Sequence, residues 1–458
     1  MTTARGPSRP PAVEAVLVAV RAALSGERDH AVLAAVVRGV VDEERERLRE
    51  ARVPRTVDQL AAATIEELHA RDRSWAEGLA AAINATGVVI HTNLGRVPWP
   101  AAAIEAARAA AQEPLLLELD QRTGRRGRRY RTAEELLVAL TAAEDALVTN
   151  NNAAAVALAV GLAGRGGGVA VSRGELVEIG GGVRIPEIVR RAGARLVEVG
   201  TTNRTRAADF EAPLADGRAR LVLRVHRSNF RQEGFTEDPD PAAVAELAHA
   251  RGALVVDDIG SGALLDTAAV GLAHEPMPGE RLAAGADLVT FSGDKLVGGP
   301  QAGLIVGRGD LVARLRRDPL ARAMRPDKTT LAAIAATLAL YRGGRAQTEI
   351  PVWQMLSASI DRIRARAERL ATTIPGAAVV ELESTVGGGS LPGETLPSAG
   401  VALPEPSADR LLASLRTGAR PVIGRIERGR VVLDLRTVMP EHDGALAAAV
   451  RAATKAAE

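Results

Sequence analysis

The chain has 458 residues, with 58 basic and 56 acidic side chains, which is enough for one large α/β domain and smaller units at its ends. It has no cysteine, so disulfide frameworks, thiolate nucleophiles and cysteine-bound zinc are excluded. The histidines form no close ligand pair, and no uncharged stretch of about 18 residues occurs. We therefore expect a cytoplasmic protein with no membrane segment and no protein-held metal.

The first part of the chain is predicted to be helical. From residue 12 to about residue 82, apolar residues recur three and four positions apart, which indicates a small helical domain over residues 1–82. One segment of it is dense in arginine, and interleaved glutamates make a solvated face as good an explanation as an RNA-binding one. These arginines are Arg45, Arg47, Arg49, Arg52 and Arg55.

Residues 83–340 alternate short β-branched runs with helix-length segments, which is typical of a parallel sheet covered by helices on both faces. We predict a large α/β domain with a mostly parallel sheet of seven strands. The predicted strands are Ala146–Thr149, Gly168–Ser172, Arg195–Gly200, Arg220–His226, Ala253–Ile259, Asp287–Ser292 and Gly303–Gly307.

Residues 341–458 have a different character and are predicted to form a small C-terminal α/β domain. A helix over 357–373 leads into a loop rich in glycine, serine and proline over 386–400. Short strands follow around 401–403, 421–427 and 430–435, and an alanine-rich helix ends the chain.

Unusual residues follow the predicted strands at their carboxyl ends, where open α/β sheets bind ligands. After the first strand, Asn151, Asn152 and Ala153 begin a helix, which would place backbone N–H groups and amide side chains around a phosphate. Helix capping by asparagine is the simpler explanation.

The strand over 253–259 contains Asp257 and Asp258, which are costly to bury without a partner. The next strand ends at Ser292, and Asp294 and Lys295 follow in a glycine-rich turn. Pyridoxal phosphate requires an amine for its imine, a carboxylate for its pyridinium and an anchor for its phosphate, so these features together predict that cofactor. A structural salt bridge between Lys295 and Asp294 is the alternative.

The remaining lysines, Lys328 and Lys455, lie at a helix start and in the terminal tail. Among the arginines, Arg322 and Arg325 lie three apart, and with Arg96 they would suit a small doubly charged oxyanion. Separate structural roles for these arginines are the alternative.

Six segments, in order over nearly the whole chain, resemble bacterial selenocysteine synthases, the L-seryl-tRNA(Sec) selenium transferases. They are INATGVVIHTNLGR (83–96), EIGGGVRIPEI (178–188), VGTTNRT (199–205), FSGDKLVGGPQAG (291–303), RAMRPDKTTLAA (322–333) and GGGSLPGETLPS (387–398).

The resemblance implies a fold type I pyridoxal phosphate enzyme, similar to aspartate aminotransferase in fold. Lys295 matches the cofactor lysine, and an Asp-Leu-Gly-Ser-Gly pattern places the pyridine partner at Asp258 rather than Asp257. Positions associated with the selenium donor are matched by Arg96, Arg322 and Arg325. His226 would lie against the cofactor ring or protonate the leaving hydroxyl, unless it is only structural.

The implied reaction converts L-seryl-tRNA(Sec) to L-selenocysteinyl-tRNA(Sec) with selenophosphate, through an aminoacrylyl group on the cofactor. The family also implies tRNA binding by residues 1–82 and a homo-oligomer built as a ring of dimers, such as a decamer. One alternative is a pyridoxal phosphate lyase or β-eliminase acting on a free amino acid or amino sugar. Another is a tRNA-binding protein with an inactive core.

Overall fold

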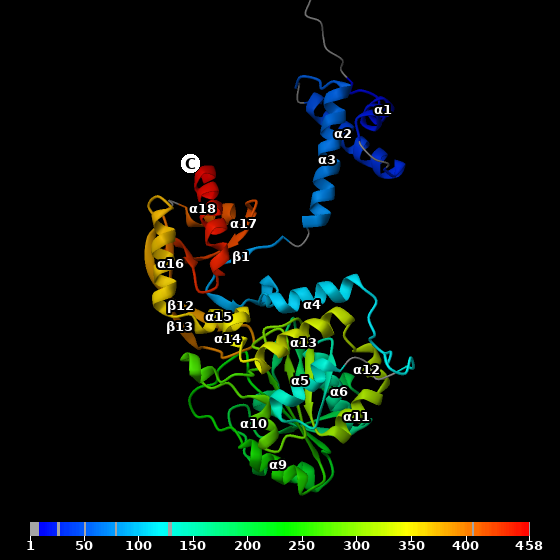
Figure 1. Ribbon diagram of the computed structural model, residues 1–458, viewed down its shortest axis with the longest axis vertical. Helices are drawn as coiled ribbons and strands as arrows, with labels where there is room; N and C mark the ends of the chain where they lie inside the picture. The colour runs from blue at the N-terminus through cyan, green and yellow to red at the C-terminus, as the bar shows by residue number, and fades with distance from the viewer. Residues whose placement is uncertain are drawn as a thin grey trace, which may run out of the picture. The chain divides into compact units, whose positions relative to one another are not determined.

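The structure is a computed structural model that describes residues 9–24, 28–49, 52–77, 80–126, 131–404 and 407–457 (Figure 1). The chain divides into two compact units, Met1–Ala81 and Ala82–Glu458. None of the helices in these ranges combines the length and apolar character needed to cross a bilayer.

The first unit consists of three helices, as the apolar periodicity predicts. They are α1 (Val13–Ala23), α2 (His30–Arg49) and α3 (Val57–Glu77). Buried residues three and four apart on each helix meet in one core, which includes Val16, Val37 and Leu60.

The arginine-dense segment of this unit is held by ion pairs. Glu44 is completely buried and accepts hydrogen bonds from Arg47 at 2.7 Å and from the Arg55 side chain at 2.6 Å. Burial acts to raise the pKa of Glu44, but the hydrogen bonds from Arg55 and Arg47 outweigh it and the pKa is lowered. Arg45 and Arg49 also pair with acids of α2. These contacts favour a structural, solvated face.

The second unit contains the large sheet, and all seven predicted strands are present in it. Their order is β3-β11-β10-β9-β8-β4-β7, and β11 runs in the opposite direction to the other six. The strands are β3 (Asp145–Thr149), β4 (Gly168–Ser172), β7 (Arg195–Val199), β8 (Leu221–Val225), β9 (Leu254–Gly260), β10 (Leu288–Ser292) and β11 (Gly303–Gly307).

Helices cover both faces of this sheet, and alternate strand residues point to opposite faces (Figure 1). Leu288 and Ile305 share a core with α6 (Asn152–Val160), α7 (Ile185–Arg191) and α11 (Gly309–Arg317). Val289 and Leu304 share another with α5 (Thr132–Thr141) and α13 (Lys328–Arg342), and α9 (Pro241–His249) packs on β8 and β9 through a third. The predicted α/β layering is confirmed.

A second sheet has the order β15-β16-β13-β12-β2. Its strands are β2 (Val88–Ile90), β12 (Ala378–Gly387), β13 (Thr395–Leu403), β15 (Arg425–Glu427) and β16 (Arg430–Asp434). A separate pair joins β1 (Ile83–Asn84) to β14 (Val422–Ile423). Residues 83–90 therefore pair with C-terminal strands, although we expected them to begin the large domain. The helices α16 (Ile360–Thr372), α17 (Ala408–Thr417) and α18 (Asp443–Ala457) pack on this part.

The loop predicted over 386–400 is present but shorter, because β12 continues to Gly387 and β13 begins at Thr395. Proline and glycine suggested a loop, but Pro397 lies where β13 pairs with β12 alone. A strand tolerates proline where one side has no partner strand. The real connection is residues 388–394, and it reaches the large sheet at Lys295, as described below.

Candidate active site

Lys295 follows β10 at the carboxyl end of the large sheet and is buried, with 7 % of its surface exposed. Its Nζ donates to the carbonyl oxygen of Gly389 at 3.4 Å. Burial lowers the pKa of Lys295, and the positive charge of Arg96 lowers it further, while nearby carboxylates, Asp258 foremost, act in the opposite direction. The amine is therefore closer to its neutral, nucleophilic form than an exposed lysine would be.

The turn after Lys295 is fixed by two buried aromatic side chains. Trp353 Nε1 donates to the carbonyl of Leu296 at 2.9 Å, and the Tyr341 hydroxyl lies 2.9 Å from the carbonyl oxygens of Leu296 and Val297. Trp353 also donates to Tyr341 at 2.6 Å. These contacts hold the backbone of the turn and so restrict the position of Lys295.

Gly389 brings the β12–β13 connection against the lysine. Its φ is +82°, and a Cβ at this position would lie 2.4 Å from Lys295 Nζ. The left-handed backbone favours glycine here, and a Cβ would displace the end of the Lys295 side chain from its present position.

Asp258 is 4 % exposed and lies near Lys295. Its Oδ1 accepts hydrogen bonds from Asn152 Nδ2 at 2.8 Å and from Thr290 Oγ1 at 3.1 Å. Burial raises the pKa of Asp258, and the Asn152 hydrogen bond and the Lys295 charge only partly oppose this. A cationic ring N–H placed here would stabilise the carboxylate.

Strand alternation separates the two acids of β9. Asp258 faces the side covered by α6, whereas Asp257 lies 3.7 Å from Arg281 Nε. The sequence pattern alone allowed either acid to be the partner of the cofactor ring. The contacts place Asp258 near Lys295 and Asp257 near Arg281.

At the start of α6, the asparagines have different partners. Asn151 caps the helix by accepting from Ala154 N at 2.9 Å, as the simpler explanation predicted, whereas Asn152 binds Asp258. Helix geometry leaves the first N–H groups, including that of Ala153, without intrahelical acceptors, so they point toward any anion placed there.

His226 and Ser292 also lie at strand ends near Asp258 and Lys295. His226 follows β8, its backbone N–H donates to Asp258 O at 2.8 Å, and its ring is one-quarter exposed. Ser292 is the last residue of β10 and is buried. It lies two residues after Thr290 in the same strand. Both residues lie at the carboxyl end of the sheet, where open α/β sheets bind ligands.

Buried polar atoms without a hydrogen-bond partner gather in the segments around Lys295. Native interiors leave few such atoms unpaired, so their presence fits a site that binds a polar ligand. Within the described ranges they include Asn152 Oδ1, His226 Nε2, Ser261 Oγ, Glu275 Oε1 and Ser390 Oγ. No group of histidines and acids in those ranges is arranged to hold a metal ion.

Arg96 binds Asp294, with 2.9 Å between Nε and Oδ2, and its Nη1 lies 3.5 Å from the Gly388 carbonyl oxygen. Asp294 therefore pairs with Arg96. The salt bridge between Lys295 and Asp294, which was the alternative, is not found among the described residues. Because Arg96 also acts on the charge of Lys295, it belongs to the same site.

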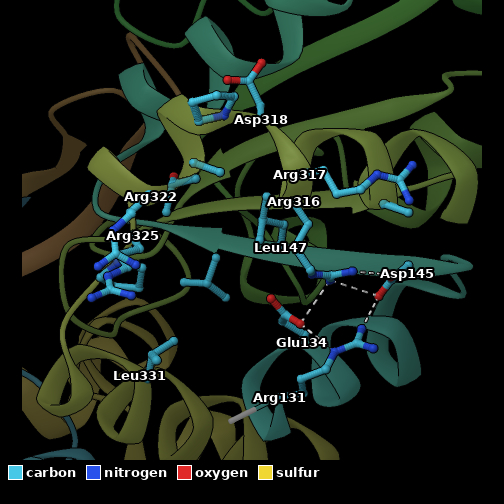
Figure 2. A pocket seen from close by; sticks show the side chains of 16 residues that line it. Arg131, Glu134, Asp145, Leu147, Arg316, Arg317, Asp318, Arg322, Arg325 and Leu331 are labelled. Atoms are coloured by element: carbon cyan, nitrogen blue, oxygen red, sulfur yellow. Dashed lines mark hydrogen bonds and ion pairs between the residues drawn. The ribbon is translucent and has the colours of Figure 1, made fainter. Parts of the chain in front are cut away.

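Arg322 and Arg325 line a cavity of about 660 Å³ beside the edge strand β3. Figure 2 shows both side chains extending to one end of it, away from an ion-paired cluster that includes Arg316 and Asp145. Arg325 lies 3.5 Å from Glu118. Among the described residues, no hydrogen bond or ion pair joins either arginine to Arg96. The segment does reach the end of β3, where Asn150 N donates to Met324 O at 2.8 Å.

Several site residues were not found from the sequence. Thr290 and Glu275 carried no local signal, and the role of Asn152 as a partner of Asp258 depends on how β9 and α6 pack. The glycine run around Gly389 was a usable signal, because consecutive glycines mark close backbone approach.

Fold type I pyridoxal phosphate enzymes place a lysine and an aspartate at the carboxyl ends of neighbouring strands in such a sheet, and this chain belongs to that class. Its residues fit the cofactor through the Lys295 amine, the Asp258 carboxylate, the open N–H groups of α6 and the unpaired polar atoms. A solved structure of a D-glucosaminate-6-phosphate ammonia-lyase has the same fold, with a TM-score of 0.60, 22% identity, and coverage of 84% of this chain and 98% of that one.

The family is narrower than the fold. A family model described as L-seryl-tRNA selenium transferase matches residues 82–439. The L-seryl-tRNA(Sec) selenium transferase of Rhizobium meliloti is 46% identical, over 94% of this chain and 95% of that protein. The one from Klebsiella pneumoniae is 43% identical, over 91% and 92%. The chain therefore belongs to the L-seryl-tRNA selenium transferase family.

Replacing Gly389 by alanine should prevent cofactor binding while the protein still folds, because the new Cβ would occupy the space of Lys295 Nζ. Gly393→Ala is the matched control: its φ is also +82°, but the nearest atom to a Cβ is 3.8 Å away. Visible absorbance of bound pyridoxal phosphate is the measurement. Equal cofactor binding by the two variants would contradict the proposed packing of the glycine turn on the lysine.

Replacing Arg96 by glutamine should shift cofactor uptake to higher pH. Only the neutral amine forms the imine, and removing a positive neighbour raises the pKa of Lys295, so less neutral amine exists at neutral pH. Uptake should be several-fold slower there and should recover as the pH rises. The control is Arg345→Gln, which removes an exposed arginine paired with Glu349. An unchanged pH profile in the Arg96 variant would count against this electrostatic coupling.

Proposed function

We propose that this chain replaces the hydroxyl of L-seryl-tRNA(Sec) with selenium from selenophosphate and so makes L-selenocysteinyl-tRNA(Sec). The observation that carries the proposal is the buried Lys295 near Asp258 in a chain whose curated relatives, named for this activity, match it over nearly its full length. The name of these relatives gives the substrate, and the site supplies the residues that the chemistry needs.

Lys295 and Asp258 divide the work at the reacting serine. When bound, pyridoxal phosphate supplies a sink for the electrons left at the serine Cα. Lys295, whose pKa burial and Arg96 lower, takes the Cα proton on Nζ. Asp258, fixed by Asn152 and Thr290, would keep the ring nitrogen of the bound cofactor protonated by its negative charge. The open N–H groups at the start of α6 would hold its phosphate.

Arg96, Arg322 and Arg325 are proposed to bind selenophosphate, because guanidinium groups bind such oxyanions through paired hydrogen bonds. Arg96 lies with Lys295, whereas the other two line the cavity beside β3 and make no described contact with Arg96. A single site could contain all three arginines if a second copy of the chain contributed one or two of them. We therefore propose a homo-oligomer built from dimers, with rings such as a decamer as the larger assembly.

The helical residues 1–82 are proposed to bind the tRNA, with residues 83–340 and 341–458 as the catalytic and C-terminal domains. Paired arginines on α2 leave little free charge there, so RNA contacts by shape and by other residues of the unit are expected. Because the proposed substrate is a charged tRNA, we propose that the enzyme acts in the cytoplasm.

A lyase acting on a small substrate is not favoured. The ammonia-lyase structure shares the fold at 22% identity, whereas the curated selenium transferases reach 46% over 94% of this chain. Similarity of fold alone does not assign a reaction.

Single-turnover conversion of seryl-tRNA(Sec) with selenophosphate tests the function. We expect selenocysteinyl-tRNA(Sec) from the wild type, and a loss of at least about 10²-fold in Lys295→Ala, which removes the base. Lys455→Ala is the control, because this exposed lysine lies in the last helix. Cofactor binding by the wild type without any turnover of the charged tRNA would overturn the proposed substrate.

A further inference from the structure

A buried acid that the mechanism above does not use faces His226. Glu275 is 2 % exposed, and its Oε1 lies 3.3 Å from His226 Nε2. The distance is within ion-pair reach, yet neither atom has a hydrogen-bond partner among the described residues. A buried carboxylate without a partner is costly, so the imidazole is the group available to compensate it.

The loop that carries Glu275 is built to hold it in this position. Thr267, completely buried, donates from Oγ1 to Ala273 O at 2.6 Å and accepts from Glu275 N at 2.9 Å. The neighbouring His274 points outward, with its ring bound to Asp266 at 2.9 Å and to Glu280 at 3.0 Å. Contacts on both sides therefore fix the loop and direct Glu275 inward.

Glu275 also acts on the catalytic lysine. It is one of the carboxylates whose charge acts on Lys295, and His226 bonds through its backbone to Asp258. His226 thus contacts the backbone of Asp258, Glu275 acts on the charge of Lys295, and the His226 ring is one-quarter exposed.

Resting on the function proposed above, we propose that Glu275 is a positioning residue whose carboxylate pairs with His226 at Nε2, so that the imidazole is held in place to act as the acid for the departing serine hydroxyl. Lys295 Nζ takes the Cα proton, and the electron pair left at Cα forms the Cα–Cβ double bond as the Cβ–O bond breaks. The oxygen takes a proton from His226 and leaves as water. His226 regains a proton from solvent, and Lys295 returns its proton to Cα when the selenium of selenophosphate adds to Cβ. Water then cleaves the Se–P bond, and phosphate leaves.

The pairing is tested without turnover by the reaction of histidines with diethyl pyrocarbonate, which modifies uncharged imidazole, followed by peptide mapping of the full-length protein. In Glu275→Gln, His226 should react several-fold faster than in the wild type at neutral pH. The matched control is Glu280→Gln, which removes the acid 3.0 Å from His274 Nε2 and should leave His226 unchanged. An unchanged His226 rate in Glu275→Gln would overturn the pairing.

The positioning role is tested by a double-mutant cycle on single-turnover loss of serine from seryl-tRNA(Sec). Glu275→Gln should slow the step roughly 10- to 100-fold, part of what a general acid contributes, with the KM for seryl-tRNA unchanged. In a His226→Gln background the same change should have no further effect. Slowing that persists in that background would show that Glu275 acts by another route and would overturn the proposal.

Two further outcomes separate this proposal from the function on which it rests. If Glu275→Gln does not fold, Glu275→Asp, which keeps the charge at shorter reach, takes its place in both measurements. If the wild type transfers no selenium but His226 still becomes more reactive in Glu275→Gln, the pairing stands and the proposed function fails. An active wild type with no effect of Glu275 on either readout overturns the positioning role alone.

Discussion

The burial of the Lys295 amine is the constraint on which the rest of the site depends. A charged ammonium is costly to desolvate, and here burial and the nearby Arg96 both favour the neutral form. Asp294, the neighbouring acid that would otherwise hold Lys295 as a salt bridge, is bound by Arg96 instead. Arg96 thus has two effects. It pairs with the carboxylate of Asp294, and its positive charge disfavours a second positive charge on the Lys295 amine.

The two sheets meet this constraint together. The large sheet supplies Lys295 and Asp258 from adjacent strands, and the aromatic pair Tyr341 and Trp353 fixes the turn that follows the lysine. From the second sheet, the β12–β13 connection places the Gly389 carbonyl 3.4 Å from the amine. Any shift between these sheets would open the lysine to water, and its amine would then gain charge. The glycine with a left-handed backbone, Gly389, is far from β9 and β10 in sequence. It nevertheless lies against Lys295 in space, because the packing of the two sheets brings it there.

The sequence was most informative where the physics is local. The strands of the large sheet are short segments rich in β-branched and other apolar residues, so all seven were predicted, and residues at their carboxyl ends identified Lys295, Asp258 and Asn152 as a site. What could not be predicted depends on long-range packing: the approach of Gly389, the pairing of residues 83–90 with C-terminal strands, and the binding of Arg96 to Asp294. The strand at Thr395 was missed because turn-forming residues also occur where a strand has one open side.

The most direct measurement identifies the lysine that holds the cofactor. Borohydride reduction of the protein loaded with pyridoxal phosphate fixes the cofactor covalently, and digestion at arginine releases residues 282–308 as a peptide with Lys295 as its single lysine. We expect the added mass on that peptide and on no other. Labelling of Lys328 or Lys455 instead, or of no lysine at all, would contradict the assignment of the buried amine as the catalytic centre.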